Sequence, residues 1–149
     1  MSDPLDLPTR VRLAVYEHFV SRQVAPTVAD LAAALRITPE VAQSALESLA
    51  EAHVLVLHPT TRALWMAAPF SAVPTGFQVR TGRGQWWANC VWDAFGIPAL
   101  LGEPGKVIAV CAGSGAPLEL ELPRDGVAGE AVAHFAVPAR HWWDDIGFT

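Results

Sequence analysis

Cys90 and Asp93 are the two residues with the clearest capacity for chemistry, and they lie three positions apart in a tryptophan-rich segment. The segment 86–101 predicts a helix that ends near Gly96. Residues at i and i+3 share one face of a helix, with Cβ atoms roughly 5–6 Å apart. A sulfur nucleophile would then lie beside a carboxyl group that can donate a proton. We therefore expect chemistry on a compound that is both hydrophobic and attracted to sulfur.

Each of these residues also has a purely structural interpretation. Free cysteine is among the most buried residue types, so Cys90 could serve only in packing. Asp93 argues against this, because a carboxyl group is costly to bury on an apolar helix unless it has a partner or a function. Tryptophans are more often core than site residues, which fits Trp86, whereas we assign Trp87 and Trp92 to a pocket for the organic part of a substrate.

The remaining candidate ligands have simpler explanations. Cys111 ends the apolar run 107–111, which predicts a core strand, and we expect it to be structural. His134 and His141 have no second His, Cys or carboxylate at metal-ligand spacing, so we expect neither to bind a permanent metal.

The composition limits the number of domains, the cellular location and the kind of partner that we expect. The 149 residues suit one domain or two small ones sharing a core, and 52% of them are hydrophobic, with a mean hydropathy of +0.28. No apolar run approaches the roughly 18 residues of a membrane helix, and residues 1–6 do not resemble a secretory signal. We expect a cytoplasmic protein with reduced thiols. The net charge of −5 disfavours a nucleic-acid partner.

Local signals predict three helices and a hairpin in residues 1–68. The expected elements are helices over 8–22, 27–35 and 38–53, then strands over 54–57 and 63–66. This is the winged-helix arrangement, which often binds DNA. The third helix, however, carries Glu40, Glu47 and Glu51 and no Lys or Arg, so it would repel phosphates. We expect this module to pack on the second domain instead.

Residues 69–149 predict a small mixed α/β domain. After a connecting segment over 69–76 and the helix of Cys90, the pattern predicts strands over 106–111, 118–122 and 131–137 and a short helix over 139–146. The fold class is therefore α+β, with a winged-helix-like helical module (1–68) followed by a mixed α/β catalytic domain that contains an antiparallel sheet (69–149).

Several motifs in this second half resemble the organomercurial (alkylmercury) lyases. They are the segments 88–94 and 96–101, Cys111, the turn 115–118 and the tail 141–149, and the resemblance covers about residues 75–149. It implies protonolysis of a carbon–mercury bond, which yields a hydrocarbon and Hg²⁺ and detoxifies mercury. Cys90 would bind mercury, since soft metals prefer thiolates. Asp93 would take the thiol proton and later pass it to carbon.

The resemblance also implies the partners of the reaction. No organic cofactor is needed, because mercury is substrate and product. The expected partners are an organomercurial and, for the released Hg²⁺, a thiol acceptor or a mercuric reductase, with no nucleic acid and no membrane. The range of organic groups accepted and the oligomeric state stay open.

The chain departs from the family pattern at its last residue. The family places a second catalytic cysteine directly after the Phe-Thr that ends the tail motif, whereas this sequence stops at Thr149. We expect either a truncated sequence or a following codon that encodes selenocysteine rather than a stop. Two alternatives to the lyase are a non-enzymatic mercury- or thiophile-binding protein of the same fold and a winged-helix regulator, which the acidic third helix disfavours.

Overall fold

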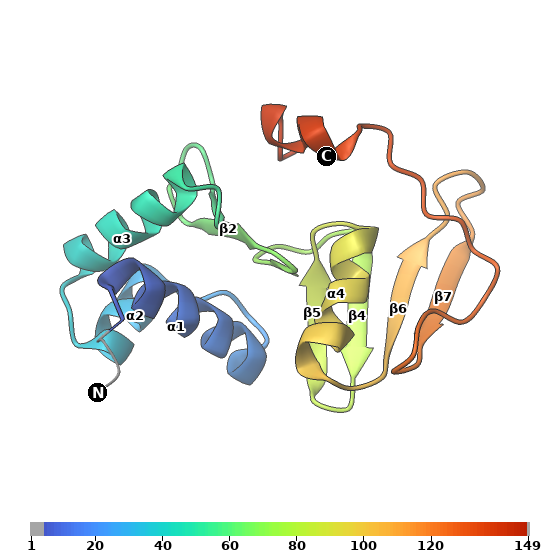
Figure 1. Cartoon of the computed structure of the whole chain (residues 1–149), viewed down its shortest axis with the longest axis horizontal. Coiled ribbons are helices and arrows are strands. Elements are labelled where there is room, and N and C mark those ends of the chain that lie inside the picture. The colour runs from blue at the N-terminus through green and yellow to red at the C-terminus, as the bar shows by residue number, and fades with distance from the viewer. Residues whose placement is uncertain (1–4, 149) are drawn as a thin grey trace.

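The computed structural model describes residues 5–148, so the prediction about Thr149 lies outside the described residues. Helices and a single antiparallel sheet confirm the α+β class (Figure 1). The helices are α1 (Leu7–Arg22), α2 (Val28–Leu35), α3 (Pro39–Glu51), α4 (Val91–Leu101) and the 3-10 helix η1 (Ala139–Asp144). The strands are β1 (Val56–Leu57), β2 (Leu64–Ala67), β3 (Phe70–Ser71), β4 (Phe77–Thr81), β5 (Gly84–Ala88), β6 (Gly105–Val110) and β7 (Pro117–Leu122), in the order β1-β2-β3-β5-β4-β6-β7.

Local capping signals set the starts of the first three helices where the sequence predicts them. The Thr27 hydroxyl accepts a hydrogen bond from the Asp30 amide at 3.1 Å, and the Asp30 carboxylate accepts one from the Thr27 amide at 2.8 Å. This capping box satisfies two amides that the first turn of α2 leaves without partners. The Thr38 hydroxyl caps α3 by accepting a hydrogen bond from the Val41 amide at 3.4 Å, and Pro39 occupies the first turn, where its missing N–H costs nothing. The three predicted helices are confirmed.

One sheet and one core connect the two predicted regions. The short strand β3 pairs with β2 on one side and β5 on the other, so the sheet continues across residues 68 and 69. Phe70 of β3 is fully buried and stacks on Phe19 of α1, with ring centroids 5.0 Å apart. The indole N–H of Trp86 donates to the Phe19 carbonyl oxygen at 2.6 Å. The N-terminal helices are thus anchored on the sheet strands that lead to Cys90, while the division at residue 68 remains a prediction.

The predicted helix over residues 86–96 is wrong at both ends. Residues 84–88 form β5, in which Trp86 and Trp87 pair with Val79 and Gln78 of β4, because aromatic side chains fit a half-buried strand as well as a helix. Helix α4 begins only at Val91 and runs through Gly96 to Leu101. Gly96 does not end it: the helix ends instead at Gly102, whose backbone adopts the left-handed conformation (φ 67°) that glycine favours.

Two further expectations about the second half are corrected, and one strand was missed. The expected connection over 69–76 contains β3, and the strand β4 was not predicted. Residues 131–137 form no strand, and Val132 is 91% exposed. A strand needs a paired neighbour, and in the described chain the outer edge of β7 makes only one isolated bridge, from Glu121 to Ala128. The predicted 106–111 and 118–122 hairpin is confirmed by β6 and β7. Within residues 5–148, no helix is long and apolar enough to cross a membrane.

Candidate active site at the start of helix α4

The junction between β5 and α4 brings Cys90 and Asp93 together. Cys90 is the N-cap residue, with extended backbone angles (φ −149°, ψ −177°), and Asp93 lies in the first turn. Cys90 makes no side-chain capping hydrogen bond, but its thiol is close enough to Asp93 for both the Asp93 backbone N–H and the Asp93 carboxylate to influence its pKa. The two predicted residues are therefore neighbours, as expected from their spacing, although Cys90 precedes the helix instead of lying within it.

The surroundings of the Cys90 thiol shift its pKa in both directions. Its burial raises the pKa above the ordinary value for cysteine, and the nearby Asp93 carboxylate raises it further. The backbone N–H groups of Asp93 and Trp92 act in the opposite direction, because positive amide dipoles at a helix start favour a thiolate. The net shift is upward, so the free thiol keeps its proton at neutral pH.

Asp93 has a raised pKa as well. Burial is the main cause, and a hydrogen bond from the Asn89 side chain partly offsets it. The Asn89 amide nitrogen Nδ2 donates to Asp93 Oδ2 at 2.8 Å and to the Phe70 carbonyl oxygen at 3.2 Å. A raised pKa makes the carboxylate a better proton acceptor than an ordinary aspartate. Asn89 was not identified from the sequence, although a polar residue between an apolar strand and Cys90 was a visible signal.

Cys90 and Asp93 both line a pocket of about 540 Å³. Most of its wall is apolar or aromatic, and its other lining residues are His53, Val54, Leu55, Val56, Met66, Ala68, Phe77, Asn89, Trp92, Trp142, Trp143, Ile146, Gly147 and Phe148. Trp92 lines the pocket, as expected for a substrate-binding residue. Trp87 does not. Residues 87 and 88 belong to an extended strand, which rises about 3.3 Å per residue. Trp87 therefore lies farther from Cys90 than it would in the predicted helix.

The C-terminal tail and the end of α3 complete the pocket wall. Figure 1 shows the tail returning from the β7 edge of the sheet toward the side of the molecule where α3 ends. The Trp143 ring stacks on the His53 ring, with centroids 4.1 Å apart and planes within 5°. The Trp142 indole donates to the Val137 carbonyl oxygen at 2.8 Å. The tail belongs to the family resemblance, but the sequence did not indicate that His53, Trp142 or Trp143 would line the pocket.

Cys111 lies elsewhere and is not the core-strand residue that the sequence predicts. It has the same strand parity as the buried Val107 and Ala109, but β6 ends at Val110 and the turn to β7 begins at Cys111. The thiol is partly exposed, and the Ser114 hydroxyl and the turn amides lower its pKa. It lines a separate pocket, and none of the described residues there is an aspartate or glutamate.

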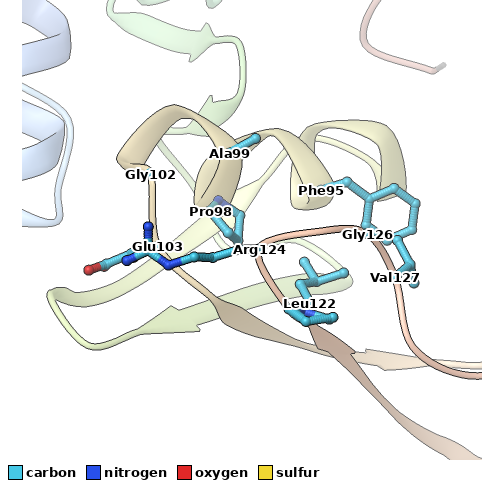
Figure 2. A pocket seen from close by; sticks show the side chains of 10 residues that line it. Phe95, Pro98, Ala99, Gly102, Glu103, Leu122, Arg124, Gly126 and Val127 are labelled. Carbon is cyan, nitrogen blue, oxygen red and sulfur yellow. The ribbon is translucent and has the colours of Figure 1, made fainter.

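Other polar groups of the described residues lie apart from Cys90 and Asp93. A pocket of about 430 Å³ between the C-terminal half of α4 and the chain after β7 is lined by Glu103 and Arg124 but by no cysteine (Figure 2). His141 is satisfied by Asp144, with Nδ1 and Oδ2 2.9 Å apart. Over residues 5–148, no group of three or more His, Cys, Asp or Glu side chains is placed to hold a metal ion.

Comparison with known proteins identifies the family. The family model described as alkylmercury lyase matches residues 70–149, which is more than half of the chain and includes Cys90, Asp93 and the tail. The chain belongs to the alkylmercury lyase family. Its fold is similar to a solved structure titled "Crystal structure of the mercury-bound form of MerB2", with a TM-score of 0.62 and 21% sequence identity.

That similarity covers 83% of this chain and 61% of the MerB2 chain, so this chain spans about three-fifths of the length of that relative. No match was found among curated proteins. The family match begins at β3, so it covers the β5–α4 junction in which the structure brings Cys90 and Asp93 together.

Proposed function

We propose that this protein cleaves the carbon–mercury bond of organomercurials by protonolysis and thereby takes part in mercury detoxification. The observation that carries the proposal is the shared position of a thiol, Cys90, and a carboxyl group, Asp93, in one apolar pocket at the start of α4. Membership of the alkylmercury lyase family supports the same reaction.

In the first step, the organomercury cation R–Hg⁺ binds to the sulfur of Cys90. Although the free thiol is protonated, a coordinating thiol loses its proton to form the metal–sulfur bond. The Asp93 carboxylate accepts this proton, and its raised pKa makes it suited to do so. The S–H bond is replaced by an S–Hg bond, and an O–H bond forms on Asp93.

In the second step, Asp93 returns the proton to the carbon bound to mercury. The thiolate donates electron density through mercury, and the electron pair of the C–Hg bond forms the new C–H bond. The products are the hydrocarbon R–H, Hg²⁺ on the Cys90 thiolate, and the ionised Asp93 carboxylate. No electron is gained or lost overall, so the reaction requires no redox partner.

The surrounding residues suit the other components of this reaction. The aromatic wall formed by Trp92, Trp142 and Trp143 would hold the organic group through apolar contact. We expect no organic cofactor, and we expect a thiol acceptor or a mercuric reductase to receive Hg²⁺ in the cytoplasm. Nucleic acid and membrane remain unexpected partners, since α3 presents acidic side chains such as the exposed Glu40.

A second candidate function is binding of mercury compounds without cleavage. It is favoured by one observation: among the described residues, Cys90 is the only cysteine that lines the pocket. A single thiolate can hold an organomercury cation but pushes less electron density toward carbon than two would.

One experiment separates the two functions. The full chain is incubated with phenylmercury and a small thiol, and released benzene is measured together with mercury retained on the protein. We expect benzene in proportion to Hg²⁺ formed, and none from Cys90→Ala. Retention of intact phenylmercury with no benzene would establish binding alone and exclude the lyase.

A further inference from the structure

Asn89 links three elements around the reactive pair. It lies between the end of β5 and Cys90, and its Nδ2 atom donates to the Phe70 carbonyl oxygen of β3 and to Asp93 Oδ2 of α4. Both amide hydrogens are therefore used, at 3.2 Å and 2.8 Å. Phe70 is fully buried in the core, so the amide connects the Asp93 carboxyl to a rigid part of the fold.

These two acceptors fix which way the Asn89 amide faces. Turning it over would bring Oδ1 against a carbonyl oxygen and a carboxylate oxygen, neither of which can donate to it. In the observed orientation, Oδ1 is buried and accepts no hydrogen bond from the described residues. A buried acceptor without a partner is unfavourable, so the orientation is set by the two donor bonds.

The same arrangement distinguishes the two oxygens of Asp93. Oδ2 accepts the Asn89 hydrogen bond, whereas Oδ1 receives no hydrogen bond from the described part of the chain. We propose that Asn89 is a positioning residue: it holds Oδ2 of Asp93 against β3, so that Oδ1 is the oxygen that exchanges a proton with Cys90 and with substrate carbon. This proposal rests on the proposed function of Asp93 as the proton carrier.

The Asn89 hydrogen bond also stabilises the ionised carboxylate. Burial raises the pKa of Asp93 and the Asn89 donor lowers it, so the bond favours the ionised form, which is the form that can accept a proton. Three other titratable groups are near: the Cys90 thiol, Tyr16 of α1, whose pKa is raised mainly by burial and to a lesser extent by the Asp93 charge, and His53, which lines the same pocket. Among the described residues, Asn89 is the side chain that donates a hydrogen bond to the Asp93 carboxylate, so it is the contact that the test removes.

The test measures the Asp93 titration itself in the metal-free full chain. The NMR signal of the Asp93 carboxyl carbon, assigned by its loss in Asp93→Asn, is followed against pH in the parent, Asn89→Ala and Asn89→Leu. Both variants remove the donor and leave burial unopposed, and the second keeps nearly the shape of asparagine without adding a charge. If Asn89→Ala does not fold, Asn89→Leu carries the test. We expect an upward shift of the titration midpoint in both.

Thr75→Val is the matched control. The Thr75 hydroxyl donates to the Ala88 carbonyl oxygen and so anchors the same end of β5 without touching Asp93. It should lower stability but leave the Asp93 midpoint in place. An unmoved midpoint in both Asn89 variants, or an equal shift in Thr75→Val, would overturn the proposal.

Turnover provides a separate readout. Single-turnover hydrocarbon release should fall on the order of 10–100-fold in Asn89→Ala, as is typical when a partner of a reacting group is removed. The acid limb of its pH profile should move upward with the NMR midpoint. If no protein in the set, including the parent, releases hydrocarbon, the proposed function fails, while the midpoint comparison still decides the role of Asn89.

Discussion

The β5–α4 junction and the β6–β7 turn each place one cysteine within two residues of the end of a strand, yet the pKa values of the two thiols shift in opposite directions. Cys90 is half-buried at the start of an 11-residue helix, and burial raises its pKa. Cys111 lies in a tight hairpin turn, where its carbonyl oxygen accepts the Gly115 amide at 2.8 Å and the Ser114 hydroxyl lowers the pKa of its thiol. By thiolate content alone, Cys111 would be the more reactive of the two.

The difference shows that a low pKa does not by itself create this kind of site. Protonolysis needs a ligand for mercury and a proton donor within reach of the same atom. Cys90 has Asp93 in its pocket, whereas the pocket beside Cys111 has no carboxyl group among its described lining residues. In the proposed reaction mercury displaces the thiol proton on binding, so a raised pKa would not prevent Cys90 from acting, and it would limit unwanted reactions of the free thiol.

The largest expected effect tests the two cysteines directly. Cys90→Ala should abolish mercury binding in the pocket and reduce hydrocarbon release to background. Cys111→Ala should keep turnover and cost no more than about 1 kcal/mol of stability, because it removes only a partly exposed side chain. Mercury titrations, benzene release and thermal melts of both variants provide the measurement. Loss of turnover in a stably folded Cys111→Ala would reverse the roles assigned here.

The next effect concerns Asp93, the carboxyl group that the Cys90 pocket has and the Cys111 pocket lacks among its described lining residues. Asp93→Asn should still bind Hg²⁺ through Cys90 but lose about 10²–10⁴-fold in single-turnover cleavage, the usual contribution of a positioned acid. An amide has no acidic proton to give to carbon. Mercury affinity is measured on the same preparation. A variant that cleaves near the parent rate would remove Asp93 from the mechanism and leave it a structural partner of Asn89.

A smaller effect follows from the opposite pKa shifts of the thiols. Iodoacetamide reacts with thiolate, so at neutral pH it should modify Cys111 before Cys90. Peptide mass spectrometry over time gives the two rates separately. Faster modification of Cys90 in the metal-free protein would show that the helix amides outweigh burial at that thiol.

The sequence predicts the parts of this molecule that depend on near neighbours in the chain. Thr27 with Asp30, and Thr38 with Pro39, set helix starts through contacts three residues apart or fewer, and the structure confirms them. The closeness of Cys90 and Asp93 was also predictable, because i to i+3 spacing brings side chains together at a helix start as well as inside a helix.

The parts that were missed depend on contacts between distant residues. The tryptophans of β5 fit helix or strand locally, and only their pairing with β4 makes them a strand. The His53–Trp143 stack joins residues 90 positions apart, and nothing near either one indicates it. The Asn89 bond to the Phe70 carbonyl spans 19 residues and requires β3 to be a strand, which the prolines around it conceal.

The smallest expected effect is on the pH dependence of stability, which should change in a variant of the β5–α4 junction but not in a variant of the β6–β7 turn. The pKa of Asp93 is higher in the folded protein than in the unfolded chain, so the native state holds the extra proton as pH rises from about 3.9, the ordinary aspartate value. Stability therefore falls as pH rises from the unfolded to the folded pKa of Asp93, and it stays lower above the folded pKa.

Asp93→Asn tests this pH dependence, because its side chain cannot ionise but its side-chain oxygen can still accept the Asn89 hydrogen bond. We expect the variant to match the parent in melting temperature below this window and to exceed it by a few degrees at neutral pH. Cys111→Ala, which leaves Asp93 intact, should follow the pH dependence of the parent. An Asp93→Asn protein that melts below the parent at neutral pH would mean that the ionised carboxylate stabilises the β5–α4 junction, and that the cost of its burial is not the dominant influence there.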